Sequence, residues 1–380
     1  MTPESEAELA EMIRASTGPL AIRGGGTQAL AVTGEVVSTE RLSGISLYEP
    51  GALTVVARSG TPVCDLEAAL AAENQRLAFE PYDCRVLLGT GGEPTLGGVM
   101  AANRSGPRRV QVGAARDFAL GMRFVDGSSR IVKNGGRVMK NVTGYDLVRM
   151  MCGAFGQLGV LTEVALKVLP APETEATVTL RGLTDARAVE AMAAALGTPF
   201  EVTGAAHCAD IIEGGPMTLL RVEGFEASVR YRADRLKERL GAFGAQIDLL
   251  EDGASRWVWN GVRHAAVMRD MPGDVWRLCC KASEAPALLG RAGALGSYMD
   301  WGGGLVWLRM PEGADLRGRL GTFRGHATLM RAATEVKARL GVLHPEPPGV
   351  ERLAAGLRAR FDPRGLFNRG LAGPLREGDR

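Results

Sequence analysis

The chain has 380 residues, of which 46% are hydrophobic and 23% are charged, and its formal net charge is +2. The length and composition predict a globular protein of about two domains, and the small net charge argues against nucleic acid or an anionic membrane surface as a partner. No run of 18 apolar residues occurs, which excludes a transmembrane helix. The acidic, amphipathic stretch 1–14 lacks the basic start and apolar middle of a secretory signal, so we expect a cytoplasmic protein.

The first half of the chain is predicted to be rich in strands. Hydrophobic periodicity and capping signals predict helices over 4–16 and 62–73, and strands over 18–23, 53–60 and 160–170.

Between these elements lies a glycine-dense stretch, 89–113, where we expect a long functional loop without regular structure. A hairpin is predicted over 118–132, with Asp126 and Gly127 at its turn.

A domain boundary is predicted at Pro170 and Pro172, which gives domains over 1–170 and 171–380. The second domain changes rhythm, because strands and helices alternate in it. The predicted elements are strands over 176–183, 201–208, 217–224 and 245–250, helices over 185–196, 226–240 and 349–361, and a weaker strand–helix pair over 275–292. Two β-α-β units of similar length predict a repeated split β-α-β module over an antiparallel sheet, so the fold class is α+β in both domains.

Three consecutive glycines follow the first predicted strand, in "RGGGT" at 23–27. The sequence contains no Walker loop, and a dinucleotide fingerprint would need a glycine at position 29, which is alanine. A tight turn would need one or two glycines. Three favour an anion nest, in which successive N–H groups face one concave side without Cβ clashes.

Two further glycine-rich stretches lie at 89–106 and 141–161. Backbone without side chains on this scale lets a large flat ligand lie close to the main chain. In the stretch 141–161 a regular helix is a poor alternative, because each glycine weakens a helix by roughly 1 kcal/mol relative to alanine.

Together the three stretches, "RGGGT", "PTLGGVMAANRSGPRRVQVGAARDFALG" and "GYDLVRMMCGAFGQLGVLTEVALKVLP", resemble the FAD-binding domain of the vanillyl-alcohol oxidase and p-cresol methylhydroxylase (PCMH) type. The resemblance spans about residues 5–170 and implies a two-part FAD-binding domain. It implies that the "RGGGT" loop binds the pyrophosphate, that Thr95 and its neighbours line the flavin, and that the backbone near Val160 faces the adenosine. The cofactor-binding residues it implies are Arg23, Gly24, Gly25, Gly26, Thr27, Gln28, Gly91, Pro94, Thr95, Leu96, Gly97, Gly98, Asn103, Gly106, Gly144, Asp146, Gly153, Gly159, Val160, Leu161 and, from a C-terminal tail at 361–370 that returns to the flavin, Asn368.

Some members of this family attach FAD covalently, through a histidine just after the loop glycines or a cysteine just before "PT". Those places hold Thr27 and Glu93 here, so the resemblance implies noncovalent FAD.

The segments "WNGVRHAAVMRD", "DWGGGLVWL", "RGHATLMRA" and "FDPRGLFNRG" resemble the accessory FAD-binding subunits of bacterial glycolate oxidases, and extend the resemblance over nearly the whole chain. It implies a heteromeric complex with a homologous FAD-domain catalytic subunit and an iron–sulfur subunit. Such a complex oxidises glycolate to glyoxylate, passes electrons toward quinone and associates peripherally with the inner face of the cell membrane.

Oxidation of a 2-hydroxy acid needs a cation for the carboxylate and a base for the hydroxyl proton. The candidates are Arg263 and Arg324 for the cation and His264 and His326 for the base. The histidine cluster and H-G-x-G turn of related dehydrogenases are absent. Three hypotheses therefore stay open: a catalytic flavin subunit, a noncatalytic flavin-carrying or structural subunit whose partner does the chemistry, and a standalone FAD-dependent 2-hydroxy-acid oxidoreductase.

The remaining motifs have structural interpretations. Gly302–Gly304 are predicted to form a hairpin turn rather than a cofactor contact. The six cysteines form no CxxC pair, which predicts free thiols without iron–sulfur ligation or another metal site. Cys279 and Cys280 lie in a predicted strand and face opposite sides, so we interpret both as packing residues.

Overall fold

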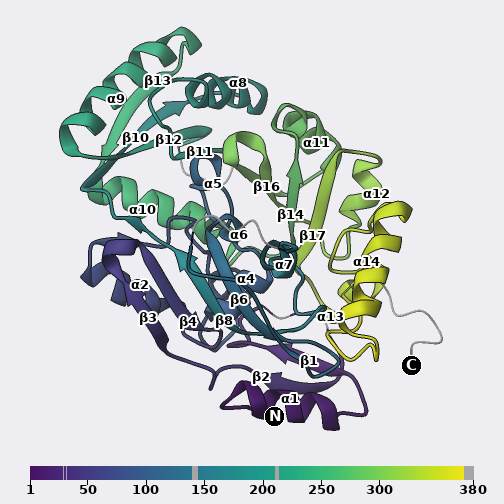
Figure 1. Ribbon diagram of the computed structural model, residues 1–380. Coiled ribbons are helices and arrows are strands. Elements are labelled where there is room, and N and C mark those ends of the chain that lie inside the picture. Colours follow the sequence, from purple (N-terminus) through teal and green to yellow (C-terminus); the bar gives the residue numbers. More distant parts are fainter. Residues whose placement is uncertain (29, 31, 139–143, 210–213, 372–380) are drawn as a thin grey trace.

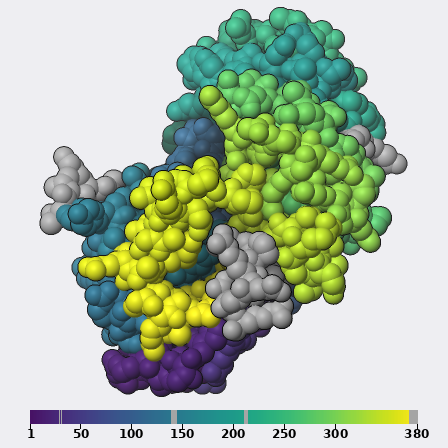
Figure 2. Space-filling view, turned by 90° about the vertical axis from the view of Figure 1, so that its right-hand side faces the viewer, coloured from purple at the N-terminus to yellow at the C-terminus, as the bar shows by residue number. Residues whose placement is uncertain are grey.

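The computed structural model describes residues 1–28, 30, 32–138, 144–209 and 214–371, and two large antiparallel sheets dominate it. Figure 1 shows the sheet of the first half below that of the second half, with the C-terminal helices returning along one side toward the N-terminus. Figure 2 shows the same C-terminal segment, in yellow, lying over the first half of the chain. No helix within the described ranges is long and apolar enough to cross a membrane.

The N-terminal layer pairs a helix with a small parallel sheet. Helix α1 (Glu6–Ala15) begins at Ser5, whose side chain accepts a hydrogen bond from the N–H of Glu8, and it buries Leu9 and Ile13. Strands β1 (Leu20–Arg23) and β2 (Glu35–Ser38) pair in parallel. The tail completes this layer, because the N–H of Leu20 donates to the carbonyl of Leu366 and that of Asn368 donates back to Leu20. The tail therefore packs on the N-terminal layer, and its predicted return to a flavin stays a prediction.

The first large sheet has the order β3-β4-β8-β6-β7, and its β6-β7 pair is the predicted hairpin. The strands are β3 (Ile45–Glu49), β4 (Thr54–Arg58), β6 (Ala119–Val125), β7 (Ile131–Gly135) and β8 (Val160–Lys167), and β5 (Gln75–Arg76) pairs separately with β9 (Leu169–Pro170). Helix α2 (Val63–Ala72) packs on this sheet through Leu66 and Leu70.

The prediction of a structureless loop over 89–113 is wrong. This region carries α4 (Leu96–Ala101) and α5 (Arg109–Val112), flanked by α3 (Arg85–Leu88) and α6 (Ala115–Phe118), and the third glycine stretch carries α7 (Leu147–Met151). Each of these helices is too short to produce a visible hydrophobic period. The side chain of Thr95 begins α4 by accepting from the N–H of Gly98, and Asp146 begins α7 in the same way. Residues 141–143 of that stretch lie outside the described residues.

The second large sheet has eight strands in the order β13-β10-β12-β11-β15-β16-β14-β17. Its strands are β10 (Thr174–Arg181), β11 (Gly204–Cys208), β12 (Met217–Gly224), β13 (Gln246–Glu251), β14 (Asp274–Cys280), β15 (Gly296–Asp300), β16 (Leu305–Met310) and β17 (Gly325–Arg331). Its helices are α8 (Asp185–Leu196), α9 (Glu226–Leu240), α11 (Ala285–Ala292) and α12 (Leu316–Leu320). The element order β-α-β-β-α-β therefore occurs twice, and the second copy is the fuller form of the weak strand–helix pair that the sequence predicts. The predicted turn at Gly302–Gly304 connects β15 to β16.

The four helices cover one face of this sheet, where the largest apolar core lies. Helix α10 (Asp252–Arg263), which separates the two β-α-β-β-α-β copies, covers part of the opposite face, and its Trp259 donates to Thr177 at 2.8 Å. Helices α13 (Thr334–Leu340) and α14 (Pro348–Phe361) then lead to the tail. Strand β9 ends at Pro170 and β10 begins at Thr174, and we keep the division into domains at residue 170 as a proposal.

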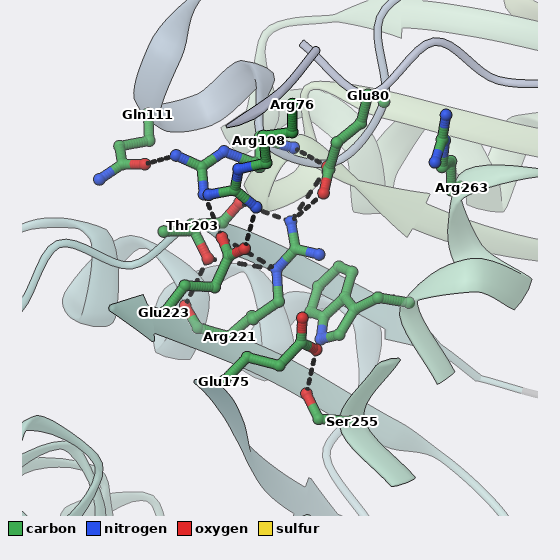
Figure 3. A network of polar contacts seen from close by, with 12 residues as sticks. Arg76, Glu80, Arg108, Gln111, Glu175, Thr203, Arg221, Glu223, Ser255 and Arg263 are labelled. Atoms are coloured by element: carbon green, nitrogen blue, oxygen red, sulfur yellow. Dashed lines mark hydrogen bonds and ion pairs between the residues drawn. The ribbon is translucent and has the colours of Figure 1, made fainter. Parts of the chain in front are cut away.

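A buried ion network joins the two halves of the chain (Figure 3). Glu223 on β12 pairs with Arg108 and, at 2.6 Å, with Arg76, both from the first half. Arg221 on the same strand pairs with Glu80 at 2.9 Å. Burial alone would raise the pKa of Glu223, but the arginines outweigh burial and hold that pKa far below its usual range.

We predict that Glu223→Gln lowers the free energy of unfolding at pH 7 by about 3 kcal/mol, because it leaves buried guanidinium groups without their anion. Because the native pKa of Glu223 is depressed, its ionised form stabilises the protein above pH 4.5, the ordinary pKa, and this stabilisation is lost as the pH falls toward the native pKa. Urea unfolding of wild type and variant measures the difference.

The control is Glu201→Gln. The Glu201 carboxylate pairs with Arg232, but its side chain is 70% exposed, so this substitution should lower the free energy of unfolding by less than about 1 kcal/mol. A difference between wild type and Glu223→Gln that stays the same from pH 7 to pH 3 would contradict the assignment.

Candidate functional site

The loop after β1 presents a row of backbone donors. Among the residues that the structure describes, none accepts a hydrogen bond from the N–H groups of Gly24, Gly25, Gly26 and Thr27. All four residues line one cavity. Gly26 has a φ of +76°, a conformation that residues with a side chain adopt at a cost. Successive N–H groups arranged in this way form a site for an anion.

The loop glycines also serve a second purpose, which the sequence interpretation missed. A Cβ atom on Gly25 would lie 1.7 Å from the carbonyl oxygen of Glu93, and one on Gly92 would lie 1.8 Å from that of Gly25. The loop 24–28 therefore packs backbone against backbone on the segment 90–95. Hydrogen bonds hold this contact at both ends, from Thr90 Oγ1 to the carbonyl of Thr27 at 2.9 Å and from Gln28 Nε2 to that of Gly98 at 2.8 Å.

Asn368 joins the third glycine stretch to the first loop. Its Oδ1 accepts from the N–H of Ile22 at 2.7 Å, and its Nδ2 donates to the carbonyl of Phe155 at 2.7 Å. The N–H of Phe155 in turn donates to Ala101 at the end of α4. Asn368 lines the cavity, but both ends of its amide bind the chain, so it positions three segments.

The first cavity has a volume of about 130 Å³ and brings together residues from all three glycine stretches and the tail. The predicted cofactor residues that line it are Arg23, Gly24, Gly25, Gly26, Thr27, Gln28, Pro94, Thr95, Gly97, Gly98, Gly159, Val160, Leu161 and Asn368. Asn103 and Gly153 line a second cavity beside it, and Gln28 lines both.

Five predicted cofactor residues line neither cavity. Leu96 is buried in the core of the first large sheet. Gly106 packs against the backbone of Glu80 and donates its N–H to Phe79. Asp146 caps α7, and Gly91 and Gly144 have open space where a side chain would project. These residues share the glycine-rich segments of the cavity without facing it.

Among the lining residues from the middle of the first half that were not predicted, three have aromatic, thiol or charged side chains: Tyr82, Cys84 and Arg104. Arg104 donates to the thiol of Cys84, and its guanidinium carbon lies 4.7 Å from the centre of the Tyr82 ring. Arg104 stands within the second glycine stretch, which was the available signal for it. Tyr82 and Cys84 carry no local motif.

The second cavity, of about 550 Å³, lies between the first half of the chain and the β14-β17 edge of the eight-stranded sheet. Its lining includes Arg104, Arg109, Arg277 and His326. No carboxylate of the described residues forms an ion pair with Arg104, Arg109 or Arg277. Arg109 and Arg277 instead stack on Trp301, with guanidinium carbons 4.5 and 5.0 Å from the ring centre. The arrangement suits a small anion.

Of the four catalytic candidates, only His326 lines this cavity. Arg263 donates to the carbonyl of Pro81 and to Glu67 at 2.8 Å, which makes it a structural residue. His264 accepts from the N–H of Asp83 at 2.9 Å, and burial together with Arg263 lowers its pKa to about 4. Arg324 is exposed and lines neither cavity. The residue types alone could not distinguish an arginine or histidine that lines the cavity from one that has a structural role.

Comparison with known proteins gives likenesses to a family model, to two curated relatives and to a solved structure. Residues 1–135 match the family model described as FAD binding domain. Glycolate oxidase subunit GlcE of Escherichia coli (strain K12) is 33% identical over 93% of this chain and 92% of its own length. Glycolate oxidase subunit GlcD of Bacillus subtilis (strain 168) is 31% identical over 42% of this chain and only 33% of its own length. Among solved structures, alkyldihydroxyacetonephosphate synthase superimposes with a TM-score of 0.68 at 15% identity, over 97% of this chain and 76% of that one, which shows a shared fold.

The contact between the two loops predicts the effect of single methyl groups. Gly25→Ala should lower the free energy of unfolding by about 2 kcal/mol or more, because its Cβ would overlap the backbone of Glu93. Gly91→Ala is the matched control, since its Cβ meets nothing within 4 Å. Urea unfolding compares them, and equal stability of the two variants would refute the proposed packing of the loops.

Proposed function

The chain belongs to the family of FAD-binding glycolate oxidase subunits, and from this premise we propose that it binds FAD noncovalently and oxidises glycolate to glyoxylate within a heteromeric complex. Its membership makes it an FAD-dependent oxidoreductase. The observation that carries the proposal is the row of unpaired N–H groups at Gly24–Thr27 at the wall of the first cavity.

The chemistry of the first cavity fits the cofactor. A diphosphate needs several donors that converge without side chains in between, and the loop 24–27 supplies them. Gly159, Val160 and Leu161 line the same cavity, and their backbone would face the adenosine. When bound, FAD accepts the electron pair removed from the substrate carbon.

The residues at the sites of covalent attachment support noncovalent binding. Thr27 lacks a group that forms such a bond, and Glu93 pairs with Arg85 at 2.7 Å. Cys84 lines the cavity, but burial raises the pKa of its thiol, and a buried thiol of this kind is a poor nucleophile.

The second cavity would hold the substrate. Arg109 and Arg277 are half-buried and line the cavity without a carboxylate partner among the described residues, and a substrate carboxylate bound between them would form charge-assisted hydrogen bonds with both. His326 lines the same cavity and would accept the hydroxyl proton. This assignment keeps one of the predicted bases and replaces both predicted cations.

The partners that we propose are a homologous FAD-domain catalytic subunit and an iron–sulfur subunit that passes electrons toward quinone. Support comes from the names of the relatives, both of which are subunits of glycolate oxidase. A cytoplasmic location, peripheral to the inner face of the membrane, follows from the same proposal.

We predict that the purified chain is yellow, that acid precipitation releases FAD into the supernatant, and that anaerobic glycolate bleaches the visible flavin band.

Arg277→Gln should raise the glycolate concentration for half-bleaching about 10- to 100-fold, which corresponds to the roughly 1.5–3 kcal/mol of a charged hydrogen bond. Arg324→Gln, on an exposed residue outside both cavities, is the control and should leave it unchanged.

If the supernatant after acid precipitation is colourless, the result would contradict noncovalent FAD. Equal half-bleaching concentrations for the two variants would contradict the substrate cavity. A flavin that stays oxidised in glycolate until the partner subunit is added would favour the noncatalytic flavin carrier instead.

A further inference from the structure

Cys279 faces the second cavity, although the sequence predicts only a packing role for it. It lies near the end of β14, with its neighbour Cys280 on the opposite side of the sheet. Cys279 lines the cavity, whereas the thiol of Cys280 donates to the carbonyl of Gly303 at 3.7 Å. Strand alternation is therefore as predicted, but it gives the two thiols different surroundings.

Basic side chains from three elements surround the thiol of Cys279. Arg277, two residues earlier on β14, donates its Nη1 to Sγ at 3.2 Å. His326 on β17 is the direct register partner of Cys279. Arg109 on α5 lines the same cavity and stacks on the Trp301 ring that also carries Arg277.

These groups favour the thiolate. Burial alone would raise the pKa of Cys279, but Arg277, His326 and Arg109 outweigh burial and lower that pKa to about 7. By contrast, burial raises the pKa of Cys280 to about 12. Reactive cysteines occur in electropositive, partly accessible surroundings of the kind found at Cys279.

A second observation concerns unsatisfied donors in the arginines that line the cavity. Arg104 is only 6% exposed and lines the cavity, and its Nε has no hydrogen-bond partner in the described part of the chain. The Nε of Arg277 is also buried without a partner there. Both arginines therefore leave donor capacity unused in side chains that line the same cavity as Cys279.

We propose that Cys279 is a modification site, whose thiolate reacts with peroxides that enter the cavity between Arg109, Arg277 and His326. The sulfur attacks one oxygen of hydrogen peroxide, an S–O bond forms, the O–O bond breaks, and hydroxide leaves with the electron pair. Sulfur is oxidised by two electrons to sulfenic acid, and peroxide is reduced. The product replaces an anion beside Arg277 with a neutral, larger group.

Cys64 is the comparison within the same chain. Its greater exposure predicts that it reacts faster than Cys279, whereas the electrostatics predict that it reacts more slowly. Cys64 is exposed, but partial desolvation of its thiol and the neighbouring Asp65 raise the pKa of that thiol above 9.0. At pH 7, about half of Cys279 would be thiolate, whereas under about 1% of Cys64 would be, because its pKa lies above 9.0; the excess is at least roughly 50-fold. The lower nucleophilicity of the less basic thiolate reduces this advantage to about fivefold.

The test treats the FAD-loaded chain with hydrogen peroxide, traps sulfenic acid with dimedone, and quantifies the label at each cysteine by mass spectrometry. We expect Cys279 to be labelled about fivefold faster than Cys64 at pH 7, with a rate that rises to half its plateau near pH 7. Arg277→Gln should shift that midpoint upward by about one pH unit, and Arg324→Gln should leave it in place.

Labelling of Cys64 as fast as Cys279, or a Cys279 midpoint above pH 8 in the unmodified chain, would overturn the proposal. If Arg277→Gln fails to fold, Arg109→Gln removes a charge that lowers the pKa of Cys279 less and should shift the midpoint in the same direction by a smaller amount. An unchanged midpoint in a folded Arg277→Gln or Arg109→Gln variant would also overturn it. The outcome is independent of whether glycolate is the substrate.

Discussion

The close contact between two backbone loops is the constraint on which the candidate site depends. Gly25 and Gly92 allow the loop after β1 to lie directly on the segment before α4, where any Cβ atom would overlap a carbonyl group. With the loops held in this way, the N–H groups of 24–27 are left without partners in the described chain and line the first cavity. The same glycines therefore fix the loop and leave its donors free for a diphosphate.

The second constraint is the way in which buried arginines are neutralised. At the junction of the two halves, Glu223 and Glu80 pair with Arg76, Arg108 and Arg221, so that network is structural (Figure 3). In the neighbouring cavity, the described residues offer Arg109 and Arg277 an aromatic ring and a thiol, and no carboxylate. The chain supplies anions to the buried Arg108 and Arg221, whereas the half-buried Arg109 and Arg277 have none among the described residues, and this difference separates a structural network from the proposed ligand site.

Regular elements were predictable where their hydrophobic period was long. Helices 185–196 and 226–240 and the strand 217–224 agree with α8, α9 and β12 to the residue. The short helices between residues 85 and 118 were missed, since four to six residues show no period. Local capping by Thr95 fixes α4, but a threonine before two glycines is also consistent with a loop.

The first and the second cavity also differ in how far they could be predicted from the sequence. The first cavity was largely predictable, because its backbone donors come from contiguous glycine motifs. The second was not, because Arg109 stands in a glycine-rich segment that the sequence assigns to the flavin, Arg277 stands in a segment without a motif, and the two meet only through the packing of α5 against β11 and the turn Trp301–Gly303. Arg263 and His264 had the expected residue types, yet hydrogen bonds to Pro81 and Asp83 occupy them.

The most direct test of the central claim is amide hydrogen exchange of the peptide that covers residues 23–28, in the FAD-loaded chain and after removal of FAD. If the N–H groups of Gly24–Thr27 bind the diphosphate, these amides exchange slowly with FAD and at least about tenfold faster without it, while the core strand β8 is unchanged. Equal exchange of the 23–28 peptide in both states would contradict the account.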